Sequence, residues 1–310
     1  MWCMSSSSEP RRHSPRTRPR SPAERGLRFD APRPSAGRAG ASAQILGKHR
    51  LASFRSLVWR NWERGGRHDL PWRQTRDPYK ILVSEVMLQQ TQVSRVEGKY
   101  REFLKAFPNV RALAKAPLVE VLKVWSGLGY NRRAKFLHDA AKDIVLKHAE
   151  KMPQSLDTLL ALPGVGEYTA KAVRVFAFNE PEILIETNIR TAFFHHFYSS
   201  VLQKTRIRDE QIVPLARAAA KGQDPREWHG ALMDYGAHLK ASGVRVNAKS
   251  AHYMEQSKFE GSLRQVRGAI LKALAKELPL AEVRTKYSNR FETALASLVR
   301  EGLVAEKRVT

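Results

Sequence analysis

Apolar residues recur every three or four positions over most of the chain, which is the spacing of one buried helix face. The first such run starts at about residue 51 and stops at the glycine pair Gly65 and Gly66. Asp77 followed by Pro78 is typical of an N-cap and the first helical residue. Helices are expected over 51–64, 77–90, 93–106, 118–126, 130–148, 155–162, 188–199, 209–221 and 226–240. Sustained alternation with period two is nearly absent, so the sequence predicts an all-α fold.

Residues 258–310 differ in pattern and predict a separate small module. Three helical stretches are expected there, one around Ile270, one over residues 280–287 and one around Leu295. Gly302 ends the third, and residues 303–309 have the pattern of one strand of a wing. This order predicts a small C-terminal winged-helix module, whose partner could be DNA or another protein.

Residues 162–166, Leu-Pro-Gly-Val-Gly, interrupt two helical patterns and predict a helix-hairpin-helix turn. Two glycines let the backbone pass close to a ligand, and the amides at the following helix N-terminus can bind an anion. Gly164, Val165 and Gly166 are therefore candidate ligands of a DNA phosphate. The alternative is a glycine turn that only joins two helices.

Charge makes nucleic acid the leading class of partner. The 310 residues contain 54 Lys and Arg against 30 Asp and Glu, a formal net charge of +24, and such a field attracts polyanions. Part of the excess lies in residues 1–50, which hold 11 basic and three acidic residues with many Ser and Pro. Residues 1–48 are expected to be a disordered basic tail. The rest of the chain keeps a surplus of 16 basic residues, so the folded part is itself basic.

The sequence has no long apolar run and no apolar stretch near its start. Neither a membrane span nor a secretory signal is expected, and the location is predicted to be cytoplasmic and nucleoid-associated. Cys3 is the only cysteine, so the chain cannot form a disulfide or a thiolate-held metal cluster within itself.

Five segments, in this order, resemble the A/G-specific adenine DNA glycosylases (MutY type) of the endonuclease III superfamily. They are 70–72 (LPW), 78–80 (PYK), 84–93 (SEVMLQQTQV), 127–130 (GLGY) and 162–169 (LPGVGEYT). The likeness covers about residues 51–238. Segments 84–93 and 127–130 are specific to the adenine glycosylases, whereas 162–166 is shared by the whole superfamily.

The resemblance implies a helix-hairpin-helix DNA glycosylase fold with two helical subdomains. We expect a six-helix barrel with the hairpin over residues 70–181. Residues 49–69 and 182–255 would form the second helical subdomain, and residues 258–310 the winged-helix-like module. The implied partner is double-stranded DNA containing a mispair, bound by a monomer.

Glu85 matches the family position whose acid protonates the adenine. A glycosylase flips its target nucleotide into a pocket, where one acid protonates the leaving base. A carboxyl group that acts so near neutral pH needs a pKa raised by burial, and Val86, Met87 and Leu88 are compatible with this. By residue type alone, Glu85 would be a solvated helix carboxylate.

The second acid departs from the family pattern. Residues 185–190 resemble a family segment with aspartate where this chain has Glu186. Glu186 is the expected electrostatic stabiliser of the sugar cation, although its extra methylene could displace the carboxylate and slow the reaction. Asn188 supports this alignment and is assigned to the base pocket; the alternative is that its side chain caps a helix.

Four further residues are expected in the base pocket or the DNA stack. Gln89 and Gln90 resemble the family residues at the helix end that enter the stack or contact the flipped base, and Trp72 belongs to the matching LPW segment. Tyr168 lies where strand-cleaving members have a lysine, and because tyrosine cannot form a Schiff base, we expect no lyase activity. Lys171, one turn on, is interpreted as a phosphate contact.

No cofactor is expected. Most family members follow the segment matching residues 233–237 with four cysteines that hold an iron-sulfur cluster, whereas here residues 238–247 contain none. Lys240, Arg245 and Lys249 make this region basic, and we infer a cluster-free loop that keeps the DNA-binding role. The histidines lack a supporting carboxylate or thiolate pattern, so no metal site is predicted; they are His195, His196, His229, His238 and His252.

The sequence thus predicts a monofunctional glycosylase that hydrolyses the N-glycosidic bond of adenine mispaired with guanine or 8-oxoguanine. Tyr168 leaves open a thymine or uracil mismatch glycosylase, because thymine-mismatch members commonly carry tyrosine at that position. Glu186 and the missing cluster leave open a DNA-binding protein without catalysis. Many adenine glycosylases have a MutT-like domain that helps recognise 8-oxoguanine, and the C-terminal residues 258–310 are expected to be too short for that fold.

Overall fold

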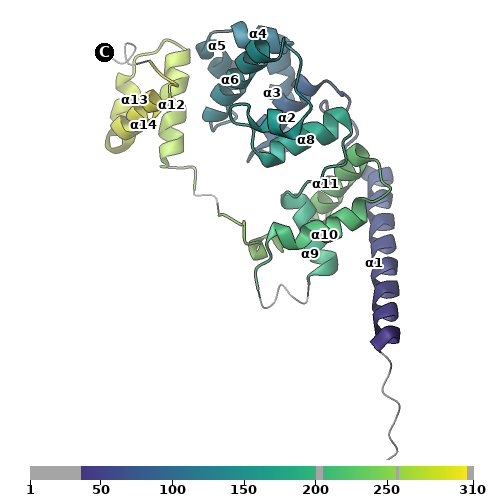
Figure 1. Ribbon diagram of the computed structural model, residues 1–310. Coiled ribbons are helices and arrows are strands. Elements are labelled where there is room, and N and C mark those ends of the chain that lie inside the picture. Colours follow the sequence, from purple (N-terminus) through teal and green to yellow (C-terminus); the bar gives the residue numbers. More distant parts are fainter. Residues whose placement is uncertain (1–35, 200–204, 256–257, 306–310) are drawn as a thin grey trace, which may run out of the picture. The chain divides into compact units, whose positions relative to one another are not determined.

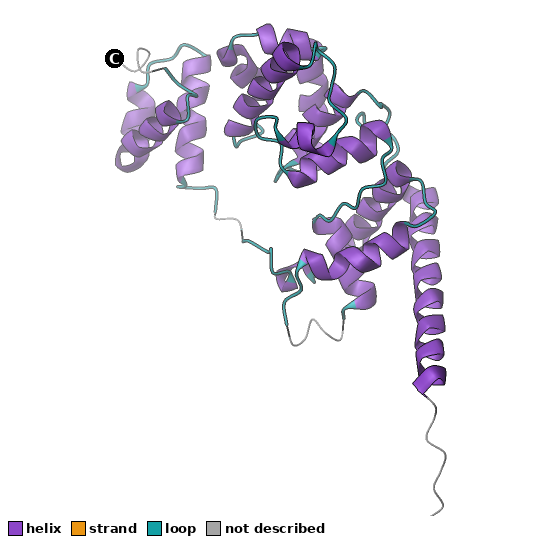
Figure 2. Cartoon of the chain, viewed as in Figure 1, coloured by secondary structure: helices purple, strands orange, loops and turns teal. Residues whose placement is uncertain are grey.

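The computed structural model describes residues 36–199, 205–255 and 258–305. Helices account for nearly all regular structure in these ranges, which contain no extended strand (Figures 1 and 2). A single parallel bridge joins Ile207 to Ser250. The prediction of an all-α fold is confirmed. Within the same ranges, no helix is both long and apolar enough to cross a lipid bilayer.

The chain divides into two compact units, residues 1–48 and residues 49–310. Helix α1, Ala36–Gly65, starts about fifteen residues before the expected position, inside the segment predicted to be disordered. The prediction was therefore wrong for residues 36–48. Pro34 and Ser35 are the last of the Ser- and Pro-rich stretch, and four alanines follow by position 43, a residue that favours helix more than any other. The rest of the predicted tail lies outside the described residues.

A first hydrophobic core is built from residues 70–173. The helices around it are α2 Pro78–Leu88, α3 Val93–Ala106, α4 Val110–Lys115, α5 Leu118–Trp125, α6 Arg132–Lys147, α7 Leu156–Leu160 and α8 Glu167–Phe178. The segment contains seven helices rather than the six expected. Helix α4, which has six residues and lies between Pro108 and Pro117, was not expected from the sequence.

Helix α2 lies at the centre of this core. Asp77 is its N-cap, with Oδ1 accepting from the amides of Tyr79 at 2.9 Å and Lys80 at 3.3 Å, and Pro78 is the first helical residue. All residues from Ile81 to Met87 are buried, two polar ones among them. A helix buried all round can therefore carry a carboxyl group into the protein interior.

A second core joins part of α1 to α9 Thr187–Phe197, α10 Asp209–Ala220 and α11 Pro225–Ala241. A short 3₁₀ helix, η2 Asn247–Lys249, follows α11. Helix α8 belongs to both cores: Ala170 and Val173 face the first, and Ala172 and Val175 face the second. The two cores thus share one helix as a common wall. The domain boundaries expected from the sequence stay a prediction.

A third core is formed by α12 Leu263–Ala275, α13 Ala281–Lys286 and α14 Ser288–Arg300. The three expected helices are present. The expected strand is not: Leu303 and Val304 fold back so that the Leu303 amide donates to the Leu298 carbonyl at 2.9 Å, and both side chains are buried in the core. Residues 306–309 of that strand lie outside the described part of the chain.

Gly236 sets how closely α11 approaches α9. A Cβ atom added at this position would lie 1.9 Å from the backbone carbonyl oxygen of Asn188. No side chain fits in that space, so only glycine allows the two helices to pack as they do.

We expect Gly236→Ala to lower the free energy of unfolding by at least ~2 kcal/mol, because the added methyl group forces the two backbones apart. Gly98→Ala is the matched control. Gly98 is also a helical glycine, but its Cβ would meet nothing within 4 Å, so alanine there should stabilise by up to ~1 kcal/mol through helix propensity. Urea unfolding of the two variants measures both effects. Equal stability of the two variants would contradict the packing argument.

Candidate active site

A cavity of about 760 Å³ lies where the two larger cores meet. Its wall includes Glu85 from α2, Tyr168 and Phe176 from α8, and the first residues of α9. The segment between α1 and α2 and the first half of α11 complete it. Of the residues predicted for catalysis and the base pocket, all seven line this cavity: Trp72, Glu85, Gln89, Gln90, Tyr168, Glu186 and Asn188.

The Glu85 carboxyl group is buried, with 8% of the residue exposed. No described residue donates a hydrogen bond to it. Burial raises its pKa from 4.5 to about 8, and the negative charge of Glu186 adds to the rise. Both causes penalise the ionised form, so Glu85 holds its proton at neutral pH.

Glu186 is the N-cap of α9. Its Oε1 accepts from the amides of Asn188 and Ile189, both at 2.8 Å, and its Oε2 accepts from the Asn188 side-chain amide at 3.1 Å. The pKa of Glu186 is raised, because burial outweighs the opposing effects of the two backbone hydrogen bonds and of the charges of Lys240 and Arg190. Donated hydrogen bonds and the helix N-terminus favour the carboxylate form.

This arrangement corrects the alternative reading of Asn188 as a helix cap. Asn188 is the second helical residue, and the glutamate two positions earlier caps the helix. The extra methylene of Glu186 lets its carboxylate fold back over the amides of its own helix while still lining the cavity.

The Tyr168 side chain packs against the second core and lines the cavity. Burial raises its pKa well above the ordinary value, and the charges of Glu85 and Glu186 add to this. The side chain is therefore a neutral phenol near both carboxyl groups, and it offers no amine nucleophile.

Gln89 and Gln90 follow the end of α2, as predicted. Gln89 is the C-cap, and its amide nitrogen donates to the Thr169 hydroxyl at 3.2 Å, which links the end of α2 to the start of α8. Gln90 has φ +54°, in the left-handed region. A residue other than glycine in this region indicates a backbone held by its surroundings.

Arg133 provides that support and was not identified from the sequence. It is buried, and its guanidinium donates to the carbonyls of Val86, Met87 and Gln89 at 2.6 to 2.9 Å. It also donates to Leu128 and Gly129 of the GLGY segment at 3.3 and 3.1 Å. Burial lowers its pKa to about 10, so it stays cationic at neutral pH. One cation thus joins the end of α2 to the GLGY segment.

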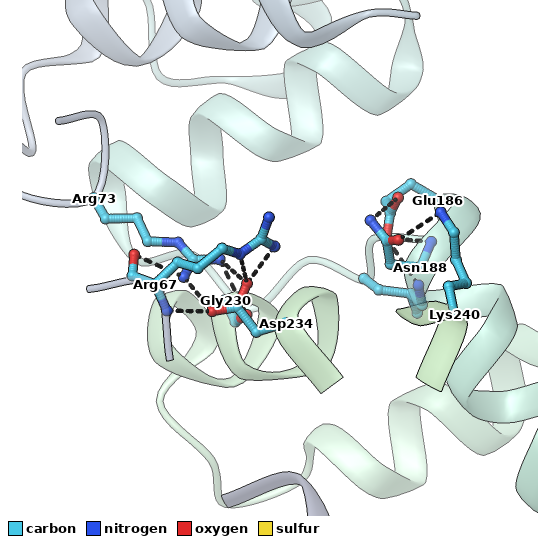
Figure 3. Close-up of polar contacts among 8 residues, drawn as sticks. Arg67, Arg73, Glu186, Asn188, Gly230, Asp234 and Lys240 are labelled. Carbon is cyan, nitrogen blue, oxygen red and sulfur yellow. Dashed lines mark hydrogen bonds and ion pairs between the residues drawn. The ribbon is translucent and has the colours of Figure 1, made fainter. Parts of the chain in front are cut away.

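Trp72 is buried in the cavity wall, edge-on to Tyr100 with ring centroids 5.5 Å apart. The segment around it is anchored by Asp234 of α11, which accepts hydrogen bonds from Arg67 and Arg73 (Figure 3). Burial acts to raise the pKa of Asp234, but the hydrogen bonds and charges of the two arginines outweigh it and lower the pKa. This ion cluster around the buried Asp234 carboxylate, also missed from the sequence, fixes one part of the cavity wall.

The hairpin is built as the glycines predict. Gly164 has φ +73°, and a Cβ there would lie 2.4 Å from the Phe136 Cβ. Gly166 is the N-cap of α8 and provides no side chain to occupy the first amides. Val165 is buried, and Lys171 pairs with Glu167 at 2.6 Å. A phosphate contact by Gly164, Val165, Gly166 and Lys171 stays a prediction.

The region after α11 does not fit an iron-sulfur cluster. Residues 238–247 contain no cysteine, and ordinary polar contacts hold the segment that follows. The Asn247 amide nitrogen donates to the Thr191 hydroxyl at 2.8 Å, and the amides of Ile207 and Ala251 close the bridge beside Ser250. In the described ranges no three His, Cys, Asp or Glu side chains gather closely enough to hold a metal ion. The absence of a cofactor stays a prediction.

Residues 83–215 match the family described as HhH-GPD superfamily base excision DNA repair protein. The chain is 35% identical over 231 residues to the adenine DNA glycosylase of Mycolicibacterium smegmatis, covering 69% of this chain and 78% of that protein. It is 33% identical over 286 residues to the adenine DNA glycosylase of Mycobacterium tuberculosis, covering 86% and 92%. A solved thermostable thymine-DNA glycosylase is similar with a TM-score of 0.56 and 26% identity, over 66% of this chain and 97% of that one.

The raised pKa of Glu85 predicts a pH-dependent stability. The folded state favours the protonated form, so the contribution of Glu85 is complete below its ordinary pKa of 4.5 and is lost as the pH rises through about 8. Between these values the wild-type chain should lose up to ~1.4 kcal/mol of stability per pH unit relative to Glu85→Gln, which cannot ionise. Urea unfolding of both proteins across this range measures the difference. Parallel stability curves would contradict a raised pKa.

Arg133→Met should remove one donor from each of five carbonyls at the α2 end and in the GLGY segment. We expect a loss of ~3 kcal/mol in unfolding free energy and faster hydrogen exchange at the Thr91 amide. Arg132→Met is the matched control, because the neighbouring Arg132 is exposed. If both variants unfold alike, the proposed anchoring role of Arg133 is wrong.

Proposed function

The chain belongs to the adenine DNA glycosylase family of the helix-hairpin-helix base-excision repair proteins, and we propose that it removes adenine mispaired with guanine or 8-oxoguanine. It is a DNA N-glycosylase. The observation that carries the proposal is the pair of buried carboxyl groups, Glu85 and Glu186, that line one cavity in different environments.

Glu85 is the general acid. With no donor to its carboxyl group among the described residues and a pKa of about 8, it carries a proton that it can give to a nitrogen of the leaving base. Protonation makes the base a better leaving group as the bond between its nitrogen and the sugar C1′ breaks. The electron pair of that bond leaves with the base, and the sugar becomes an oxocarbenium-like cation.

Glu186 stabilises that cation. Three hydrogen bonds hold its carboxylate at the cavity wall, and a negative charge placed beforehand lowers the energy of the positive sugar. Water then adds to C1′ and loses a proton, and the products are a free base and an abasic site. The DNA backbone stays intact, because Tyr168 cannot form a Schiff base.

DNA is the partner, and we propose that the chain acts as a monomer on duplex DNA that contains a mispair. The net charge of +24 supports binding to the phosphate backbone. The first amides of α8, at Gly166 and beyond, lie at a helix N-terminus suited to one phosphate. Gln90 lines the cavity in a left-handed conformation, and we assign to it the contact with the flipped nucleotide or with the gap that it leaves.

Thymine or uracil in a mismatch is the second candidate substrate. Two observations favour it: the tyrosine at position 168, and the structural likeness to a thymine-DNA glycosylase. A protein that binds DNA without catalysis is not favoured, because it would not need two buried carboxyl groups in one cavity.

The test is single-turnover base release from duplexes containing A·G, A·8-oxoguanine, T·G or U·G. We expect release of adenine from the first two. Glu85→Gln should lower the rate ~1000-fold, because the acid is lost while shape is kept, and Glu186→Gln should lower it ~100-fold or more through loss of the stabilising charge. Duplex binding, measured separately by fluorescence anisotropy, should be retained by both variants.

If only thymine or uracil is released, the substrate is the second candidate and not adenine. No abasic product from any duplex, with binding intact, would contradict the enzymatic role. Equal rates for wild type and Glu85→Gln would contradict the assignment of the acid.

A further inference from the structure

Helix α11 brings a lysine to the start of α9. Gly236 lies against the Asn188 backbone, and Lys240 is one helical turn further along the same face of α11. Its Nζ donates a hydrogen bond to the Asn188 side-chain oxygen at 3.1 Å. The close approach at Gly236 therefore places a cation beside the residue that contacts the Glu186 carboxylate.

The contacts form a directed chain from the cation to the carboxylate. Lys240 donates to Asn188 Oδ1, and Asn188 Nδ2 donates to Glu186 Oε2 at 3.1 Å (Figure 3). An ammonium group can only donate, so it must face the amide oxygen of Asn188. The amide nitrogen is then left to face Glu186, where it favours a carboxylate over a protonated acid.

The opposite orientation of the Asn188 amide would reverse this preference. Its oxygen would face Glu186 and could accept a hydrogen bond only if that residue were protonated. Lys240 prevents this reversal by occupying the oxygen. The contact of Lys240 therefore links the orientation of the Asn188 amide to the protonation state of Glu186.

We propose that Lys240 is a positioning residue of the active site, which acts through Asn188 to keep Glu186 ionised beside the protonated Glu85. The inference rests on the proposed function, because it assigns how the two acids take different roles. Lys240 contacts Asn188 and not the two acids, and no contact with the substrate is assigned to it.

Other charged or titratable groups also face Glu186. Glu85 from α2 and Tyr168 from α8 do not favour its ionised form, whereas Arg190 of α9 does. The Arg190 guanidinium, however, is paired with Asp209 through two contacts of 2.6 Å. Lys240 has no carboxylate partner in the described ranges, so its charge acts on this site without a counter-ion.

The variants that test the proposal are Lys240→Met, which removes the charge, and Lys240→Arg, which keeps it. Lys221→Met is the matched control, because Lys221 is exposed, lies in the same part of the chain and does not line the cavity. Single-turnover adenine release at saturating enzyme is measured from about pH 5 to about pH 9. Anisotropy with the same duplex at each pH ensures that binding is saturated.

The active form needs Glu186 ionised, so the rate should rise with pH as Glu186 loses its proton. Loss of the Lys240 charge raises the pKa of Glu186, and the rising limb in Lys240→Met should move up by about one pH unit, with a ~10-fold lower rate on the acidic side. Lys240→Arg and Lys221→Met should keep the wild-type limb. An unmoved limb in Lys240→Met, or the same loss in Lys240→Arg, would overturn the proposal.

A second measurement does not depend on catalysis. Carbon-13 NMR of side-chain carboxyl groups follows the titration of Glu186 directly, with the signal assigned by its absence in Glu186→Gln. We expect this titration at higher pH in Lys240→Met than in wild type or Lys221→Met. If no duplex releases adenine but the titration moves, the proposed function fails while the Lys240 contact stands; if the titration does not move, the role of Lys240 fails.

Discussion

Two carboxyl groups buried in one cavity constrain the rest of this structure. Burial disfavours the charge on each, and ionisation of one makes ionisation of the other still less favourable. The surroundings separate their roles: Glu85 on α2 has no hydrogen-bond donor among the described residues, whereas Glu186 has three. We propose that these surroundings keep Glu85 protonated and Glu186 ionised, as cleavage of an N-glycosidic bond requires.

A few close contacts hold the two carboxyl groups in their different surroundings. Helix α8 is shared by both larger cores and contributes Tyr168 to the cavity that both acids line. Arg133 fixes the end of the helix that carries Glu85, and Asp234 anchors another part of the cavity wall through Arg67 and Arg73. Glu186, which stands where the resemblance implies an aspartate, is accommodated by local geometry, since its longer side chain caps its own helix.

Much of this could be predicted from sequence where the signal is local. Asp77 and Pro78 gave the start of α2, and the motif around Glu85 placed the acid on a buried helix.

Contacts between distant segments could not be predicted: Arg132 and Arg133 are adjacent and alike in sequence, yet one is exposed and the other buried. The roles of Gly236 and Lys240 depend on the contacts of α11 with Asn188, which the sequence does not show. The early start of α1 and the turn at Leu303 and Val304, where the start of a strand was expected, show the same limit, because weak local patterns are overridden by helix propensity and packing.

We propose that Glu85 holds a proton at neutral pH while Glu186 does not. Infrared difference spectra at pH ~7, wild type minus Glu85→Gln and wild type minus Glu186→Gln, test this most directly, since protonated and ionised carboxyl groups absorb at different frequencies. We expect a protonated-carboxyl band that is lost in the first variant and a carboxylate band that is lost in the second. A carboxylate band assigned to Glu85 at this pH would contradict it.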